Sequence, residues 1–290
     1  MHITVTGAAG FLGSYLLRAL TQEVPHAQIT GVDLRPPQSP IPGVKYSSEL
    51  VPTELIFHLA GKGDIASSVE DPQTDLEINA RLTLQVLESL RAGIGSRVVL
   101  ASSCSVYGAA DSPVRENQEP RPISPYGVSK LAAEHYVRVY HHLHGIDGRI
   151  ARIGNPYGPG QRRLVIYDLA RQALRQGAPL QLRGDGTEVR DFVHAMDVAR
   201  GLIAVGLHGE PGETYNVSAG QPTSVFDVAK LIAVAAGLPQ ESVQISNQPE
   251  TGKVREFYPS IEKLKSLGFH LMQPIEQGIV ETVNWARNNP

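Results

Sequence analysis

The chain has 290 residues, of which 41% are hydrophobic and 19% charged, and its formal net charge at pH 7 is −3. This balance is typical of a globular protein with a large core, and the charge gives no reason to expect binding to nucleic acid. No apolar run approaches the roughly 18 residues of a membrane span. With no signal peptide at its start and a single cysteine, Cys104, the chain is expected in the reducing cytoplasm.

The first predicted element is a short strand from His2 to Thr6. Glycines follow it at positions 7, 10 and 13, and then a helix with leucines along one face. Glycines at this spacing let the backbone turn tightly, approach a pyrophosphate and pack the helix on the strand. The helix N-terminus would then face the phosphate charge. This segment therefore indicates a dinucleotide-binding turn.

The second predicted strand, Gln28–Val32, ends in Asp33, 20 residues after Gly13. A carboxylate at that place accepts hydrogen bonds from the adenosine ribose and repels a 2′-phosphate, which favours NAD over NADP. Arg35 is the opposing signal, because an arginine nearby could hold that phosphate. The next segment is rich in proline, so only a short strand near Val44–Tyr46 is expected there.

A buried strand covers Leu55 to Gly61, and His58 within it is interpreted as a satisfied core histidine. A long helix is predicted from Pro72 to Leu90, carrying the polar residue Asn79. The following strand, Arg97–Ala101, leads into a run of hydroxyl side chains that begins at Ser102. The carboxyl ends of parallel strands are where such sheets bind ligands.

A further helix is predicted from Pro125 to His144, with Ser124 as its N-cap. Tyr126 and Lys130 are four residues apart and so lie on one face of this helix. An ammonium beside a tyrosine stabilises the phenolate and makes the tyrosine a possible base. Taken alone, such a pair is more often a surface feature than a catalytic one.

Strands and helices alternate throughout the first half, which predicts an α/β fold with a parallel, doubly wound sheet. The second half has shorter, mixed elements. They are a helix near Leu164–Gln176, strands Leu180–Leu182 and Thr214–Val217, and helices Met196–Gly206, Val225–Ala236 and Ile275–Arg287, whereas the strand Arg149–Ile153 still belongs to the first half. We expect a cofactor domain over residues 1–158. Residues 159–290 should mainly form a smaller α/β substrate-binding domain, with some segments returning to the first.

Six motifs stand in one order along essentially the whole chain: Gly7–Gly13, His58–Gly61, Ser102–Gly108, Tyr126–Lys130, Asn155–Gly160 and Arg190–His194. In this order and spacing the chain resembles the extended short-chain dehydrogenase/reductase family, in particular its NAD-dependent nucleotide-sugar epimerases and dehydratases of the UDP-glucose 4-epimerase type. The resemblance implies a Rossmann-type fold, NAD as cofactor, no metal, and a nucleoside-diphosphate sugar, most often a UDP-sugar, as substrate. It also implies a homodimer formed through the two long helices.

The resemblance implies that Tyr126 is the catalytic base, assisted by Ser103, and that Lys130 binds the nicotinamide ribose and lowers the pKa of the tyrosine. The implied cofactor contacts are Gly7, Gly10, Phe11, Leu12, Gly13, Asp33, Leu59, Ala60, Gly61, Lys62, Asn79, Ser102, Tyr126, Lys130 and Ile153. The implied substrate contacts are Ser103, Cys104, Tyr126, Asn155, Leu164, Leu180, Arg190 and Arg255, the two arginines holding the diphosphate.

Three functions follow as alternatives. A 4-epimerase needs only the Ser103, Tyr126 and Lys130 set, and it is the leading hypothesis. A dehydratase, decarboxylase or reductase of the same family is the second. The family's 4,6-dehydratases carry Asp-Glu directly after the catalytic Ser or Thr, where this chain has Cys104 and Ser105. A neutral serine is a poor general base, although a cysteine with a shifted pKa could serve. The third is a non-catalytic protein that senses NAD(P).

Overall fold

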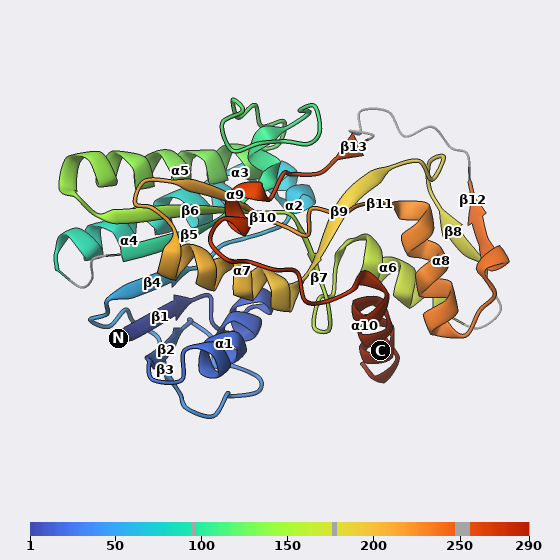
Figure 1. Ribbon diagram of the computed structural model, residues 1–290, viewed down its shortest axis with the longest axis horizontal. Coiled ribbons are helices and arrows are strands. Elements are labelled where there is room, and N and C mark those ends of the chain that lie inside the picture. The colour runs from blue at the N-terminus through green and yellow to red at the C-terminus, as the bar shows by residue number, and fades with distance from the viewer. Residues whose placement is uncertain (94–96, 176–178, 247–255, 290) are drawn as a thin grey trace.

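The computed structural model describes residues 1–93, 97–175, 179–246 and 256–289. Its main layer is a seven-stranded sheet in the order β10-β6-β5-β4-β1-β2-β3 (Figure 1), with every neighbouring pair parallel. The strands are β1 His2–Thr6, β2 Gln28–Val32, β3 Val44–Ser47, β4 Leu55–His58, β5 Arg97–Ser103, β6 Asp147–Ile153 and β10 Thr214–Val217. The doubly wound parallel sheet predicted from the sequence is confirmed.

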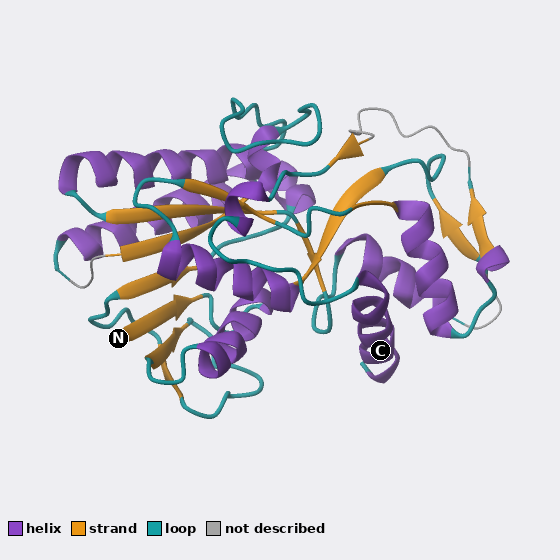
Figure 2. Ribbon diagram, in the orientation of Figure 1, coloured by secondary structure: helices purple, strands orange, loops and turns teal. Residues whose placement is uncertain are grey.

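Helices cover both faces of this sheet because successive strand residues point to opposite sides. Phe57 of β4 packs into the core with helices α1 (Phe11–Glu23) and α7 (Ala195–His208). Its neighbour Ile56 points the other way and packs with α4 (Leu82–Arg91) and α5 (Pro125–His144). The result is a three-layer sandwich (Figure 2).

The predicted helix from Pro72 to Leu90 is present but not uniform. It consists of α3 (Pro72–Leu76), a π-helical turn at Glu77–Arg81, and α4. A short helix that the sequence did not predict, α2 (Ile65–Glu70), precedes it. In the described part of the chain, no helix is both long and apolar enough to cross a membrane.

A smaller lobe lies at the other end of the molecule (Figure 1). Its helices α6 (Leu164–Ala173), α8 (Val225–Ala236) and α10 (Ile275–Asn288) share one apolar core. Its strands are β7 Asn155–Tyr157, β8 Leu180–Leu182, β9 Val189–His194, β11 Pro222–Ser224, β12 Val243–Ile245 and β13 Glu256–Phe257. The short helix α9 (Glu262–Lys265), which follows β13, packs instead in the core of the main sheet through Leu264. The strand β10 returns to the main sheet and pairs with β6. The domain division at residue 158 itself stays a prediction.

Candidate active site

The turn that opens α5 carries Tyr126 and Lys130. The Ser124 hydroxyl caps the helix by accepting a hydrogen bond from the Gly127 N–H at 3.1 Å, and Pro125 occupies the first turn. Lys130 is buried, and its Nζ donates to the carbonyl oxygen of Ala101, at the end of β5, over 3.0 Å. The same Nζ lies 6.0 Å from the centre of the Tyr126 ring. Both side chains therefore face the carboxyl end of the central strand.

Ser103, the last residue of β5, completes this group. Its hydroxyl accepts a hydrogen bond from the Ser105 N–H and donates to the Ser105 hydroxyl, each over 3.1 Å. Ser103 also acts on Tyr126, because its hydroxyl lowers the tyrosine pKa against the effect of burial. The three predicted catalytic residues are thus brought together at one strand end.

Burial dominates the electrostatics of the pair. It raises the pKa of Tyr126 to about 12, opposed in part by the Ser103 hydroxyl. It lowers the pKa of Lys130 to about 8, opposed by the carboxylates of Asp75 and Glu134. The sequence predicted a lowered tyrosine pKa, but desolvation of the phenolate outweighs any such effect in this structure.

The glycine turn after β1 forms a cradle whose backbone is packed too closely against neighbouring backbone to admit a Cβ at Gly7 or Gly13. Gly7 has φ +72°, and a Cβ there would lie 2.7 Å from the Ala60 nitrogen. A Cβ on Gly13 would lie 2.1 Å from the Gly7 oxygen. Among the described side chains, none caps the N-terminus of α1 at Gly10, so its N–H groups face the cradle. Phe11 and Leu12 form the first turn of this helix.

Asp33 closes the cradle at the end of β2. Its carboxylate accepts hydrogen bonds from the N–H groups of Ala9 and Arg35, each over 3.0 Å. This fixes the acidic side chain beside the glycine turn, where a ribose would be recognised. The turn and the carboxylate together fit a dinucleotide such as NAD.

The segment Leu59–Lys62 follows β4 and is held by Asn79 from the π-helical turn. The Asn79 amide accepts from the Lys62 N–H at 2.9 Å and donates to the Lys62 oxygen at 3.1 Å. Asn79 thus holds the segment that is predicted to line the cofactor, and its own contact with the cofactor stays a prediction. Within the segment, a Cβ on Gly61 would lie 2.8 Å from the Asn79 side-chain oxygen. A glycine at this position therefore allows Asn79 to pack closely against the segment.

Two further predicted cofactor residues lie at strand ends. Ile153 ends β6 and is buried. The Ser102 hydroxyl donates to Glu134 over 2.6 Å and so points into the protein interior. His58 is wholly buried and its ring nitrogens pair with the hydroxyls of Thr6 and Thr83, which confirms it as a core histidine. Burial lowers its pKa to about 3.

A buried ion pair lies beneath the catalytic group. Glu134 of α5 accepts hydrogen bonds from Arg152 of β6 at 2.9 and 2.7 Å and from Arg138 at 3.0 Å. Tyr107 stacks on the Arg152 guanidinium, 4.6 Å from ring centre to carbon. The Arg152 contacts bind α5 to β6, which pairs with β5, the strand that carries Ala101 and Ser103.

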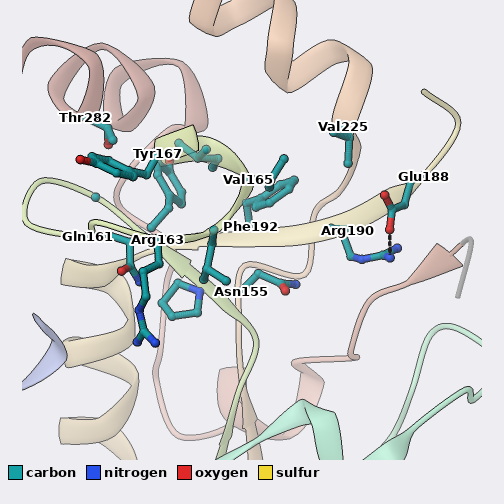
Figure 3. A pocket seen from close by; sticks show the side chains of 15 residues that line it. Asn155, Gln161, Arg163, Val165, Tyr167, Glu188, Arg190, Phe192, Val225 and Thr282 are labelled. Atoms are coloured by element: carbon teal, nitrogen blue, oxygen red, sulfur yellow. Dashed lines mark hydrogen bonds and ion pairs between the residues drawn. The ribbon is translucent and has the colours of Figure 1, made fainter. Parts of the chain in front are cut away.

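A pocket of about 220 Å³ opens in the smaller lobe beside this site (Figure 3). Three of the predicted substrate residues, Asn155, Leu164 and Arg190, line it. Arg190 of β9 forms an ion pair with Glu188, the residue directly before that strand. Leu164 is half exposed and has φ +71°, an uncommon conformation for a residue with a Cβ.

Other substrate predictions need correction. Leu180 is wholly buried in β8, in the core of the smaller lobe, and does not line this pocket. The thiol of Cys104 is buried and donates to the Arg152 oxygen at 3.4 Å, so it points away from the catalytic hydroxyls. Burial also raises its pKa. Arg255 lies outside the described residues.

Sequence reasoning missed Arg163, which lines the pocket and forms a 2.7 Å ion pair with Asp64 at the start of α2. The pair joins the two lobes beside the catalytic tyrosine, whose pKa the arginine lowers slightly against the effect of burial. The signal in the sequence was the basic pair Arg162-Arg163, one residue after the Gly158–Gly160 turn. The partner on α2 could not be predicted, because it is 99 residues away.

The chemistry of this group is that of a base with a hydroxyl relay. A substrate hydroxyl placed beside Tyr126 and Ser103 can lose its proton to the tyrosine. The Lys130 ammonium can orient a ligand that is bound next to it. The neighbouring side chains, Cys104 and Ser105, add no carboxylate to the described site. The arrangement thus suits oxidation and reduction at one carbon.

Comparisons with known proteins agree with this geometry. The model of the NAD dependent epimerase/dehydratase family matches residues 3–218. A putative UDP-glucose 4-epimerase of Methanocaldococcus jannaschii is 32% identical, with 99% of each chain covered. A dTDP-glucose 4,6-dehydratase of Streptomyces antibioticus is 29% identical, covering 100% of this chain and 93% of its own. The solved structure of MoeE5 in complex with UDP-glucuronic acid and NAD is 31% identical over the whole of both chains, with a TM-score of 0.87.

Proposed function

The chain belongs to the NAD-dependent epimerase/dehydratase family, whose cofactor is NAD, and we propose that it is a UDP-sugar 4-epimerase. The observation that carries this proposal is the pair of residues after Ser103. Cys104 is buried and turned toward Arg152, and Ser105 is neutral. Elimination of water needs an acid and a base beyond Tyr126, and these two side chains supply neither. Epimerisation needs no such pair.

In the proposed reaction, Tyr126 takes the proton of the sugar 4-hydroxyl, and the Ser103 hydroxyl shares that hydrogen bond. Bound NAD would supply the hydride acceptor and donor for sugar C4, and the glycine turn and Asp33 would hold it. Lys130 holds the cofactor ribose beside the tyrosine. Asn155 and Arg190, from the pocket wall, hold the diphosphate while the keto sugar turns over.

The experiment is incubation of the protein with NAD and a panel of UDP-, dTDP- and GDP-sugars, followed by mass spectrometry and proton NMR. We expect a product of unchanged mass with an altered C4 coupling, formed from a UDP-sugar without net consumption of NAD. Loss of water or carbon dioxide would refute the epimerase and favour the dehydratase or decarboxylase. Stoichiometric oxidation of NADH would favour a reductase, and no turnover of any sugar would favour the sensing protein.

We also propose that the protein is a homodimer joined through α5. Four apolar side chains at helical spacing lie exposed on this helix, namely Val128, Tyr136, Val139 and Leu143. An apolar stripe of this kind on a long helix favours packing against a second copy. Sedimentation should show a dimer that Val139→Asp converts to a monomer. A wild-type monomer would contradict the proposal.

We also propose that the protein is located in the cytoplasm. The support for this is the single buried thiol of Cys104, which no described cysteine can pair with in a disulfide. Fractionation of cells that express the protein tests it.

A further inference from the structure

The carboxylate of Asp75 has no part in the reaction proposed above, yet it lies buried beside the catalytic turn. Asp75 is in α3, and its exposed fraction is 0%. Its two oxygens accept hydrogen bonds from the Ser129 hydroxyl, at 2.5 Å, and from the Asn79 amide, at 3.0 Å. Both donors are neutral. In the part of the chain that the structure describes, Asp75 has no ion-pair partner within 4.0 Å.

The second carboxylate that acts on Lys130 is different. Glu134 is equally buried, but it is hydrogen-bonded to two guanidinium groups, those of Arg152 and Arg138. Its charge is therefore largely balanced within its own ion pair. Burying a carboxylate without a balancing positive charge costs folding free energy, and a cation close to Asp75 would offset that cost. Lys130 provides such a cation: a Cβ on Gly61 would lie 3.2 Å from its Nζ and 2.8 Å from the side-chain oxygen of Asn79, the residue whose amide donates to Asp75.

The hydrogen bonds of Asp75 also join the parts of the site. Ser129 stands between Tyr126 and Lys130 on the catalytic turn, and its hydroxyl lies 3.0 Å from the Tyr126 carbonyl oxygen as well. Asn79 belongs to the π-helical turn, a feature often found at functional sites. Its amide holds the Lys62 backbone beside the cofactor cradle.

We propose that Asp75 is a positioning residue with two roles. Its negative charge acts on the buried Tyr126–Lys130 pair, and its hydrogen bond from Ser129 anchors the catalytic turn. The proposal rests on the proposed function in assigning catalysis to that pair. It does not depend on which sugar is turned over.

The charged and titratable groups around the pair give the sign of the effect. For Lys130, burial lowers the pKa, and Asp75 and Glu134 raise it; His58 lies close enough to feel the lysine charge. For Tyr126, burial raises the pKa, as do Asp75 and the Cys104 thiol, whereas Ser103 and Arg163 lower it. Loss of the Asp75 charge therefore lowers both pKa values.

The test is the pH profile of kcat for Asp75→Asn in the NAD-bound protein. Asparagine keeps the shape, since its oxygen can accept from Asn79 while its amide donates to Ser129. Removal of one nearby charge moves a pKa by about one unit or more, so we expect both limbs of the profile to move to lower pH by about that amount. At a pH on the wild-type alkaline limb, this is roughly a tenfold loss of rate.

Ser129→Ala is the matched control, because it removes the hydrogen bond and keeps the charge. Its profile should fall in height without moving. A profile of Asp75→Asn that keeps its position, or a Ser129→Ala profile displaced as far as that of Asp75→Asn, would overturn the proposal.

A second measurement reads the tyrosine directly. In protein labelled with ¹³C at the tyrosine Cζ, the Tyr126 resonance is the one missing from Tyr126→Phe, and its titration midpoint should be lower in Asp75→Asn than in the wild type. An unchanged midpoint would refute the charge effect even in a protein that turns over no sugar, which separates this failure from that of the proposed function. If Asp75→Asn does not fold, Asp75→Ser is measured in the same way with the same criterion.

Discussion

Replacing Arg152 by methionine should be among the most destabilising single changes near the site. Arg152 and Glu134 are 1% and 0% exposed, and two hydrogen bonds of 2.9 and 2.7 Å join them. Breaking a buried pair by removing one partner typically costs about 3–5 kcal/mol, because the other charge stays buried. Arg138 and Ser102 remain on the Glu134 carboxylate, so we expect the low end, about 3 kcal/mol.

Urea unfolding at pH 7 measures this cost, and Arg121→Met is the control. Arg121 also forms a 2.7 Å ion pair, with Glu119, but the side chains are 79% and 74% exposed. An exposed pair contributes at most about 1 kcal/mol. A cost for Arg152→Met below about 1 kcal/mol, as for the control, would refute the reasoning. The double change Glu134→Leu with Arg152→Met should recover part of the loss, because it leaves no unpaired charge.

The cost should also depend on pH. Burial alone would raise the pKa of Glu134, but the hydrogen bonds and charge of Arg152, together with Ser102, leave it below the usual glutamate value. A group with a lowered folded pKa stabilises fully above its unfolded pKa, which is about 4.3, and loses this contribution as pH falls through the folded value. The difference between wild type and Arg152→Met should therefore shrink in acid. A difference that grows below pH 4 would contradict the assignment.

Three further changes test the site. Tyr126→Phe should lower kcat by about 10²–10⁴-fold, the usual contribution of a general base, with NAD content unchanged by mass spectrometry of the released cofactor; wild-type turnover would refute the catalytic assignment. Gly13→Ala should abolish copurification of NAD, because its Cβ would lie 2.1 Å from the Gly7 oxygen; retained NAD would show that the turn adapts. Arg163→Gln should change the unfolding free energy by less than about 1 kcal/mol, since its ion pair with Asp64 is half exposed. The same change should raise KM for the UDP-sugar. An unchanged KM would show that Arg163 does not contribute to substrate binding.

The features that the sequence by itself determined are those that depend on neighbours along the chain. The strand from His2 to Thr6, the glycine turn and the α5 cap were predictable because alternation, positive φ and N-capping are local properties. The parallel sheet was predictable from the alternation of strands and helices over most of the first half, although β2, β3 and β4 follow one another without a helix. The grouping of Ser103 with Tyr126 was predicted from the resemblance to the family, whereas the residues alone indicated only that the hydroxyls after Ala101 lie at the carboxyl end of a strand.

Tertiary structure alone decided which charges face one another. Asp64 meets Arg163, Glu134 meets Arg152, and Asp75 stands behind the Tyr–Lys turn, although nothing in their local sequence distinguishes these carboxylates from surface ones. Burial, which depends on the whole packed fold, likewise raised the pKa of Tyr126 against the local effect expected from Lys130. Desolvation and ion pairing act through space between segments far apart in sequence, and for that reason only the folded chain determines them.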